Sequence, residues 1–429
     1  MLRTILALSI FAVCSTAAAG EHWPGWRGPT GMGQTDETAL PLIWGGKTNE
    51  NVLWKTPLFP SDKVRRDQNQ SSPIVWGERA FVTVSYWPEG VSEKEYPEHH
   101  VLCFDTRDGA KVWDTVIPPG PWKLTDLRGG YTAPTPACDG ERIYVVFGSA
   151  VIAALDMSGI LAWRKEITPF HFDVAIGSSP VVFKDTVIFV SDQLREKKSS
   201  SITAFDAKNG DIRWKIERPD VDWAHSTPAL ARVGDKLQLL VANPAGPQSI
   251  DPLSGKLIWS CLITSGRFGS DRLGDTVTPV FGNNLVYIDS GRGGPGAAVD
   301  ARGQGDVSAT HVRWKLPVVP EGFSSPVIVG KHLYRLHNPG VLTSYHLTDG
   351  KEVHRERLEG IDQAVSPFAT SNGLIYCASA RTSYVIKAGP KFEVLARNEL
   401  GDASRASAAV AAGRIYLKGS RYLFCVGKK

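Results

Sequence analysis

Short apolar runs recur along almost the whole chain, and most of them follow a Ser or Thr that stands directly before a Pro. The runs are rich in β-branched and aromatic residues and are bounded by Gly, Asn and Asp, which is typical of strands rather than helices. Seven such pairs precede these runs: Ser72-Pro73, Thr135-Pro136, Ser179-Pro180, Thr227-Pro228, Thr278-Pro279, Ser325-Pro326 and Ser366-Pro367. An eighth copy, Ser407-Ala408-Ala409, has Ala in place of the Pro. This pattern predicts eight repeated units built from strands.

The spacing of the units indicates what kind of repeat they form. Measured from Pro73, or from Ala409 in the last unit, their starts are 63, 44, 48, 51, 47, 41 and 42 residues apart, with a mean of 48. A unit of this length has room for four short strands joined by turns, which is the blade of a β-propeller. The sequence therefore predicts an all-β fold, an eight-bladed β-propeller of four-stranded antiparallel blades.

The second half of most units carries an Asp-Gly turn followed by a Trp. In the third unit the turn from Asp206 to Gly210 ends at Trp214. Asp bonds the backbone of such a turn and Gly takes its positive φ, so the Trp lies on the outer strand and can pack against the neighbouring blade. The sixth unit has His354 instead, and the seventh, around Gly389, lacks both residues. The predicted docking residues are Trp54, Trp113, Trp163, Trp214, Trp259 and Trp314.

The two ends of the chain are predicted to meet in one blade. The eighth unit ends after its third strand, residues 422–426, while an unassigned strand with the right Trp, residues 51–55, precedes the first unit. We expect this N-terminal strand to complete the last blade, which removes exposed sheet edges.

The first residues have the features of an export signal. Arg3 supplies a positive start, an apolar stretch follows, and Ala17-Ala18-Ala19 offers a small-residue cleavage site. That stretch is too short to cross a bilayer, and no later run approaches the ~20 residues required. We therefore expect a periplasmic or secreted protein, cleaved after about Ala19, with no transmembrane segment.

These features predict three parts. Residues 1–19 are the signal peptide, residues 20–50 are an irregular arm packed on the ring, and residues 51–429 are a single propeller domain. Trp23 and Trp26 are expected to anchor the arm, and a ligand contact is the alternative role for them. The repeats thus replace the two or three domains that 429 residues alone suggest.

Composition and local motifs exclude several functions. The net charge is +4, and the short basic run at residues 63–66 has no interleaved aromatic residues, so nucleic acid is not an expected partner. Residues 291–296 match G-x-G-x-x-G, but a strand follows where a dinucleotide site needs a helix. His99-His100 closes an acidic insertion, for which a solvated loop is expected and metal binding is the alternative.

Cysteine usage adds little. Five cysteines follow the signal, without Cys-x-x-Cys spacing, so structural zinc and c-type haem have no support. We expect most of them to be buried apolar residues in strands. A disulfide between Cys103 and Cys425, which fall at matching places in their repeats, is left open.

The repeats resemble the pyrroloquinoline-quinone-type (PQQ-like) eight-bladed propeller family, whose docking motif is Ala-x-Asp-x-x-Thr-Gly-x-x-x-Trp. The nearest copy runs from Ala204-Phe205-Asp206 to Trp214, and the resemblance covers essentially the whole mature chain. One branch of the family comprises quinone-dependent dehydrogenases, and another comprises scaffolds similar to the outer-membrane assembly lipoprotein BamB. The resemblance implies the fold and leaves the function to be argued from sites.

The chain is more similar to the scaffold branch. The enzyme branch implies a longer chain, a vicinal Cys-Cys ring, and calcium held beside a catalytic Asp, whereas this chain is shorter, has no Cys-Cys pair and offers no assignable calcium ligands. We therefore expect a monomeric, non-catalytic scaffold for envelope or secreted proteins, with no metal and no cofactor. A quinone-dependent oxidoreductase using PQQ with calcium is the first alternative, and carbohydrate or small-ligand binding is the second.

Blade topology predicts where a partner binds. The loop that leads into the first strand of a blade and the loop between its second and third strands lie on the same face of the ring, and such loops commonly carry function. The first set of loops gives Gln70, Tyr131, Asp173, His225, Asp275, Gln363 and Arg405. The second set gives Asp192, Asn243, Arg292, Asn338, Arg381 and Arg421. The first set, together with Arg292, forms our candidate partner-binding face.

Overall fold

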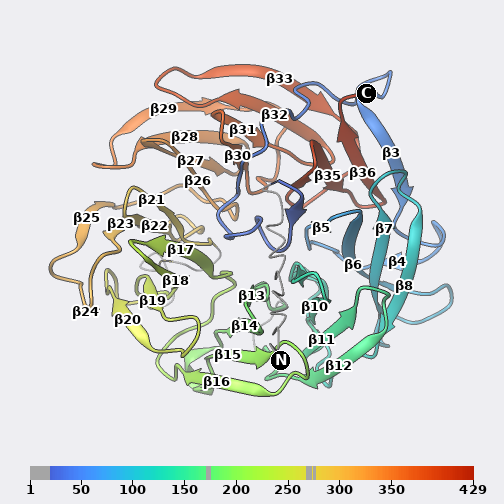
Figure 1. The fold of residues 1–429 in the computed structure, drawn as a ribbon, viewed down its shortest axis with the longest axis horizontal. Helices are drawn as coiled ribbons and strands as arrows, with labels where there is room; N and C mark the ends of the chain where they lie inside the picture. Colours follow the sequence, from blue (N-terminus) through green and yellow to red (C-terminus); the bar gives the residue numbers. More distant parts are fainter. Residues whose placement is uncertain (1–19, 171–174, 267–272, 274–276) are drawn as a thin grey trace, which may run out of the picture.

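The computed structural model describes residues 20–170, 175–266, 273 and 277–429. These residues form eight four-stranded antiparallel blades around a central axis, which confirms the predicted propeller (Figure 1). The first strand of each blade lies near the axis and the last at the rim. Within the described ranges, the helical structure is a single 3-10 turn, η1 (Arg195–Lys197), and no helix is long and apolar enough to cross a membrane.

Blades 1 to 4 follow the order of the chain, and the strands of each blade run in sequence from the axis to the rim. Blade 1 holds β5 (Ile74–Trp76), β6 (Arg79–Trp87), β7 (Glu98–Asp105) and β8 (Lys111–Ile117). Blade 2 holds β9 (Ala137–Cys138), β10 (Arg142–Phe147), β11 (Val151–Asp156) and β12 (Leu161–Glu166). Blade 3 holds β13 (Val181–Phe183), β14 (Thr186–Ser191), β15 (Ser201–Asp206) and β16 (Ile212–Glu217). Blade 4 holds β17 (Ala229–Val233), β18 (Lys236–Val241), β19 (Gln248–Ile250) and β20 (Leu257–Ser260).

Blades 5 to 8 complete the ring. Blade 5 holds β21 (Val280–Gly282), β22 (Leu285–Asp289), β23 (Gly296–Asp300) and β25 (Val312–Leu316). Blade 6 holds β26 (Val327–Val329), β27 (His332–His337), β28 (Val341–His346) and β29 (Glu352–Arg357). Blade 7 holds β30 (Phe368–Thr370), β31 (Leu374–Cys377), β32 (Thr382–Lys387) and β33 (Glu393–Glu399). Blade 8 holds β34 (Ala409–Ala411), β35 (Arg414–Lys418), β36 (Tyr422–Gly427) and the N-terminal strand β3 (Val52–Pro57), as expected for closure.

Four short strands supplement the blades. β1 (His22–Trp23) pairs with β5, and β2 (Gln34–Thr35) runs parallel to β30, so both extend the ring toward its axis. β4 (Arg65–Arg66) pairs with β6, and β24 (Gly305–Asp306) runs parallel to the outer strand β20.

The hydrophobic core lies between neighbouring blades. All residues of β11 except the last are buried, while the outer strand β12 is buried only at Trp163. A middle strand is buried because both faces of its blade are covered by adjacent blades, whereas an outer strand faces solvent. All five cysteines in the described part of the chain are buried and free, so Cys103 and Cys425 form no disulfide there.

Tryptophans join adjacent blades at the rim. Trp163 of blade 2 donates from Nε1 to Ala207 O of blade 3 at 3.0 Å, and its ring lies against Gly210. A Cβ on Gly210, whose φ is +73°, would be 2.7 Å from that ring, so only Gly fits under the Trp. Trp54, Trp113 and Trp314 donate in the same way to carbonyls of the next blade.

Two of the predicted docking residues behave differently. Trp214 lies against Gly255 of the next blade, but its Nε1 finds no hydrogen-bond partner among the residues that the structure describes. Trp259 of blade 4 donates to Gln238 Oε1 of its own blade at 3.3 Å. Beside Trp259, β24, which belongs to the insertion in blade 5, pairs with β20.

The arm supplies the tryptophan that blade 7 lacks. In blades 2, 5 and 8 the docking Trp packs on a Tyr of the second strand. In blade 7 the corresponding Tyr376 stacks with Trp44, at 6.3 Å between ring centroids, and Trp44 is fixed by Asn398 Oδ1, which accepts its backbone N–H. The sequence pattern did not identify Trp44, because it lies far from blade 7 along the chain.

A circle of hydrogen bonds around the axis explains the Ser/Thr-Pro pairs. The backbone N–H of the Ser or Thr of one blade donates to the side-chain oxygen of its counterpart in the next blade, at 2.8 to 3.1 Å. Seven links are made: Ser72 to Thr135, Thr135 to Ser179, Ser179 to Thr227, Thr278 to Ser325, Ser325 to Ser366, Ser366 to Ser407, and Ser407 to Ser72. Ser407 completes the circle, so Ala408, and not Ala409, stands where the other blades have Pro.

Blade 8 is also joined to blade 1 by a buried lysine. The Nζ of Lys418 donates to Ser71 O, Ser71 Oγ and Thr83 O at 2.8 to 3.0 Å. Burial lowers the pKa of Lys418 to about 7, although nearby Asp67 favours its charged form. Burial likewise raises the pKa of Asp67 to about 6, against the effect of its backbone hydrogen bonds.

The prediction of a solvated loop at His99-His100 is wrong. Both residues belong to β7, and His99 is fully buried between Ser85 and Ser149, with ring nitrogens 2.9 Å from each hydroxyl oxygen. Burial lowers the pKa of His99 to about 3, so it is neutral at physiological pH. Alternation along a longer strand turns His99 toward hydroxyl partners and His100 toward the carboxylates of Asp114 and Glu98. No cluster of His, Cys, Asp or Glu in the described ranges is placed to hold a metal.

Candidate binding pocket at the ring centre

The N-terminal arm closes one end of the central channel. β1 pairs with the inner strand of blade 1, and β2 pairs with the inner strand of blade 7, so the arm crosses the axis (Figure 1). Its carbonyls accept backbone N–H groups from three further blades: Gly20 from Ala412, Pro24 from Cys138, and Thr30 from Leu230. Gly33 accepts from Ala369 within the contact of β2 with β30. We call this side of the ring the arm face.

Arg27 fills the axis beneath the arm. Its Nη2 donates to Met32 O, Pro326 O and Pro367 O at 2.5 to 3.3 Å, which ties the arm to blades 6 and 7. Desolvation and the charge of Arg335 lower the pKa of Arg27 to about 9, so the guanidinium is still charged at neutral pH. The channel is therefore sealed by a side chain of the arm.

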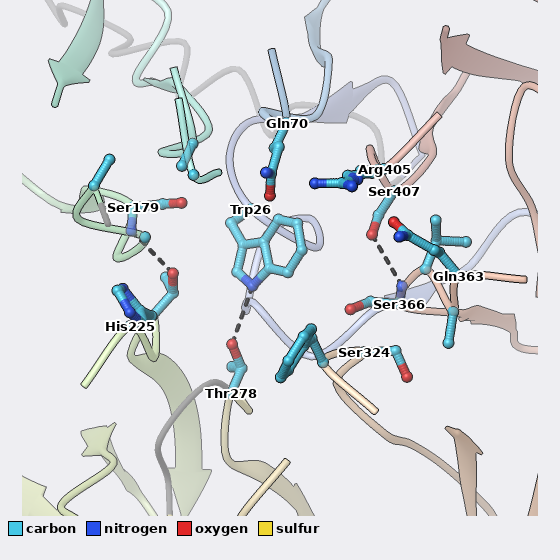
Figure 2. Close-up of a pocket in the computed structure, with 18 of the residues that line it drawn as sticks. Trp26, Gln70, Ser179, His225, Thr278, Ser324, Gln363, Ser366, Arg405 and Ser407 are labelled. Carbon is cyan, nitrogen blue, oxygen red and sulfur yellow. Dashed lines mark hydrogen bonds between the residues drawn. The ribbon is translucent and has the colours of Figure 1, made fainter. Parts of the chain in front are cut away.

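The other end of the channel is open and forms a pocket of about 460 Å³. Trp26, the neighbour of Arg27, lies in the middle of it, surrounded by side chains from the loops that lead into the inner strands (Figure 2). The lining comes from all eight blades, as the loops of Gln70, Gly129, Ser179, His225, Thr278, Ser324, Gln363 and Arg405 show. We call this side the pocket face.

Trp26 takes the place of the missing link in the hydrogen-bond circle. Its Nε1 donates to Thr278 Oγ1 at 3.0 Å, the oxygen that Thr227 of blade 4 would otherwise reach (Figure 2). The N–H of Thr227, a buried residue that lines the pocket, donates to no group in the described part of the chain. The circle thus opens at the junction of blades 4 and 5, beside Trp26.

The described lining is cationic. It contains Arg128, Arg292, Arg405 and His225, and no Asp or Glu. Arg128 pairs with Asp126 at 2.6 Å, and the guanidinium of Arg292 lies 5.3 Å from the ring centre of Phe323. Arg405 is exposed and has no ion-pair or hydrogen-bond partner among the described residues, and its guanidinium points toward Trp26 (Figure 2).

Three amide side chains add hydrogen-bonding groups to the same walls. Gln70 donates from Nε2 to Arg128 O at 2.6 Å, and Asn338 accepts the N–H of Ala364 at 2.8 Å. Gln363 lines the pocket beside them. Together with the arginines, these groups can hold a ligand that offers carboxylates and carbonyl oxygens.

The structure brings together five of the eight candidate residues. Gln70, His225, Arg292, Gln363 and Arg405 all line the pocket. Asp173 and Asp275 lie outside the described residues. Tyr131 does not reach the pocket, because its ring is buried with Trp87 and Leu124 and its hydroxyl accepts the Leu124 N–H.

Of the residues predicted from the second set of loops, Asn338 and Arg292 line the pocket. Asp192 is buried in an ion pair with Arg218, and Asn243 is buried as well. Arg381 and Arg421 pair with Asp362 and Asp402, respectively.

Sequence reasoning missed Arg128 and Phe323 and treated Trp26 chiefly as an anchor. Arg128 lies in the longest interval between two repeats, 63 residues, and that excess length was the available signal. Trp23 and Trp26 look alike in the sequence, yet Trp23 is 1% exposed, while Trp26 forms the pocket floor.

The match to known families agrees with this architecture. Residues 97–356 match the family described as outer membrane protein assembly factor BamB. The chain belongs to the BamB family. The match covers the repeats from the end of blade 1 to blade 6, which are the units with the clearest docking turns.

A curated relative of this BamB-family chain is similar to it in sequence over part of its length. The outer membrane protein assembly factor BamB of Bordetella pertussis is 28% identical over 184 residues, which is 42% of this chain and 42% of the relative. The alignment thus spans less than half of the relative's length.

Two solved structures share the fold. The crystal structure of BamB from Moraxella catarrhalis has a TM-score of 0.57 at 14% identity and covers 84% of this chain and 97% of its own. The computationally designed Ika8 protein has a TM-score of 0.53 at 10% identity and covers 88% and 99%. At these identities the likeness concerns the propeller itself and not a shared site.

Proposed function

We propose that this protein is an exported, non-catalytic scaffold that contributes to outer-membrane protein assembly by binding other proteins through its pocket face. Membership of the BamB family supports the process. The two ends of the ring differ, and this difference supports the pocket face as the binding face. The chain's own arm closes one end of the channel, and loops of all eight blades surround a polar pocket at the other. A rigid ring with convergent loops can present a fixed binding surface.

The chemistry of the described lining supports binding rather than quinone-dependent oxidation. Calcium prefers carboxylate and carbonyl oxygens, and the described lining has no carboxylate to combine with its amide and hydroxyl groups. We therefore assign no reaction step to the described lining. Under this proposal the scaffold acts as a monomer without a metal or cofactor.

The proposal is tested by crosslinking in the cells that produce the protein. A photoreactive amino acid at Gln363, on the pocket face, is expected to crosslink to an outer-membrane assembly protein identified by mass spectrometry. The matched control is Arg232, an exposed residue near the turn that follows β17 on the arm face. Crosslinks of equal yield at both positions, or none to assembly proteins, would contradict the proposal.

A second experiment addresses the process and the enzymatic alternative. Deleting the gene is expected to lower the amount of folded β-barrel protein in the outer membrane. The purified protein, incubated with PQQ and Ca²⁺ and then desalted, is expected to retain no quinone absorbance and to show no dye-linked turnover. Retained quinone with turnover would replace the scaffold by an oxidoreductase.

A further inference from the structure

We infer that the pocket binds an acidic segment of a partner protein, that is, an extended stretch of peptide with two or more carboxylates. This inference rests on the proposed function and adds the chemistry of the partner. It starts from the charge of the described lining, which has three arginines and a histidine and no acidic residue. A concave surface lined by charges of one sign attracts ligands of the opposite sign.

The distribution of the arginines favours a segment over a single ion. Arg128 leads into blade 2, Arg292 lies between the second and third strands of blade 5, and Arg405 leads into blade 8. In an eight-bladed ring, blades 2, 5 and 8 are spaced almost evenly around the axis. A peptide that crosses the mouth can place one carboxylate beside Arg405 and others toward Arg292 and Arg128, the last of which also pairs with Asp126.

Two donors in the pocket lack partners within the described residues. Arg405 is exposed and unpaired, and the N–H of Thr227 is buried where the hydrogen-bond circle opens. A buried donor without an acceptor is costly, so an oxygen supplied by a ligand would stabilise this state. Thr227 belongs to blade 4 and Arg405 to blade 8, which lie on opposite sides of the axis.

Aromatic groups of the pocket offer contacts for the apolar parts of such a segment. Trp26 stacks on no other ring in the described part of the chain, and Phe323 is 46% exposed at the edge. Trp and Arg are enriched among the residues that dominate binding energy at protein interfaces. The volume of about 460 Å³ is at the lower end of the range for ligand pockets, roughly 300–1,000 Å³, so it suits a short segment and not a folded domain.

The test measures fluorescence anisotropy of a labelled peptide of about eight residues that alternates Asp and Ser, with the mature protein. A matched peptide has Asn in place of every Asp. The variant Arg405→Glu removes the unpaired cation, and Arg232→Glu makes the same charge change on the arm face. We expect the acidic peptide to bind at least about 10-fold more tightly than the uncharged one, and the affinity to fall as NaCl rises from about 20 to about 300 mM, because salt screens exposed charges.

We further expect Arg405→Glu to weaken binding by about 10-fold and Arg232→Glu by less than about 2-fold, which corresponds to ~1.4 and under ~0.4 kcal/mol. The inference is overturned if both peptides bind alike, if both variants bind alike, or if citrate competes at the same concentration as the peptide, since a small anion would then suffice. Because Arg405 is exposed, its substitution does not threaten folding; thermal unfolding of both variants checks this.

Failure of this inference is distinguishable from failure of the proposed function. Crosslinks at Gln363 to an assembly protein, without binding of the acidic peptide, would leave the scaffold proposal intact and remove the acidic segment. Peptide binding without such crosslinks would retain the pocket chemistry and remove the role in assembly.

Discussion

Two junctions, one between blades 2 and 3 and one between blades 4 and 5, are built from the same sequence features. They differ both in their hydrogen bonds near the axis and in their Trp contacts at the rim. At the first, Thr135 donates to Ser179 near the axis, and Trp163 docks on Gly210 at the rim. At the second, Thr227 does not donate to Thr278, and Trp259 bonds within its own blade.

This difference teaches how a repeat ring acquires a site. At the junction of blades 2 and 3, both the Thr135 N–H and the Trp163 indole donate to groups of the neighbouring blade, so neither donor is left for a ligand. At the irregular junction the arm inserts Trp26, and β24 covers the outer strand. The ring therefore stays closed while a donor and an aromatic ring become available at its centre.

The largest expected effect is that of removing the rim contact of a regular junction. Trp163→Ala deletes a buried ring and its hydrogen bond to Ala207 O, and we expect a loss of about 3–5 kcal/mol in the free energy of unfolding. Urea denaturation measures it. Trp163→Phe keeps most of the packing and is expected to lose less than half as much; equal losses would show that packing is not the main term.

The glycine beneath the same Trp gives the next effect. Gly210→Ala combines a positive φ with a Cβ 2.7 Å from the Trp163 ring, so we expect a loss of about 2–4 kcal/mol. Gly413→Ala is the control, because its φ of +72° is similar and no atom lies within 4 Å. If both variants lose the same stability in thermal denaturation, the close approach of the Trp contributes nothing.

Substitutions in the hydrogen-bond circle are expected to cost less free energy of unfolding, and the cost is expected to differ between the two junctions. Ser179→Ala leaves the buried N–H of Thr135 without an acceptor, which costs about 1–3 kcal/mol. Thr278→Val removes only the hydroxyl that accepts the indole of Trp26, with an expected loss of about 0.5–1.5 kcal/mol. Chemical denaturation should rank Ser179→Ala as the more damaging change, and the reverse order would contradict the proposed opening of the circle at blades 4 and 5.

The smallest effect concerns a third junction, between blades 8 and 1, where Lys418 is buried. The pKa of Lys418 is about 7 in the folded protein and 10.5 ordinarily, so the unfolded chain holds more protons between these values. Stability therefore rises with pH above about 7, by at most ~1.4 kcal/mol per pH unit for one proton. Asp67 has a pKa of about 6 in the folded protein, above its ordinary 3.8, so it lowers stability as pH rises from about 4 to 6. Above about pH 7 the change in stability is therefore due to Lys418 and not to Asp67.

Denaturant midpoints at several pH values between about 7 and 8.5 check this dependence. Lys418→Met is expected to flatten the rise, whatever its effect at a single pH. The exposed Lys391→Met serves as the control and should keep the wild-type slope. A slope that survives in Lys418→Met would show that other groups produce it.

Most of the fold was readable from the sequence, while the site was readable only in part. The repeated Ser/Thr-Pro and Asp-Gly-Trp positions are local signals, so they identified the eight blades and the closure by residues 51–55. The loops of the pocket face identified Gln70, Gln363 and Arg405, because topology alone places them together. Tyr131 was misplaced, since its burial depends on an insertion that packs over it.

The sequence by itself determined the repeat, the number of blades and the face on which their loops meet, because these follow from patterns within some 50 residues. Only the tertiary structure decided that Trp44 completes blade 7, that Arg27 seals the axis, and that Trp26 forms the pocket floor. These roles depend on contacts between residues as many as 340 positions apart, such as Arg27 and Pro367. No local pattern records such contacts, since they arise only when the ring brings its ends and its arm together.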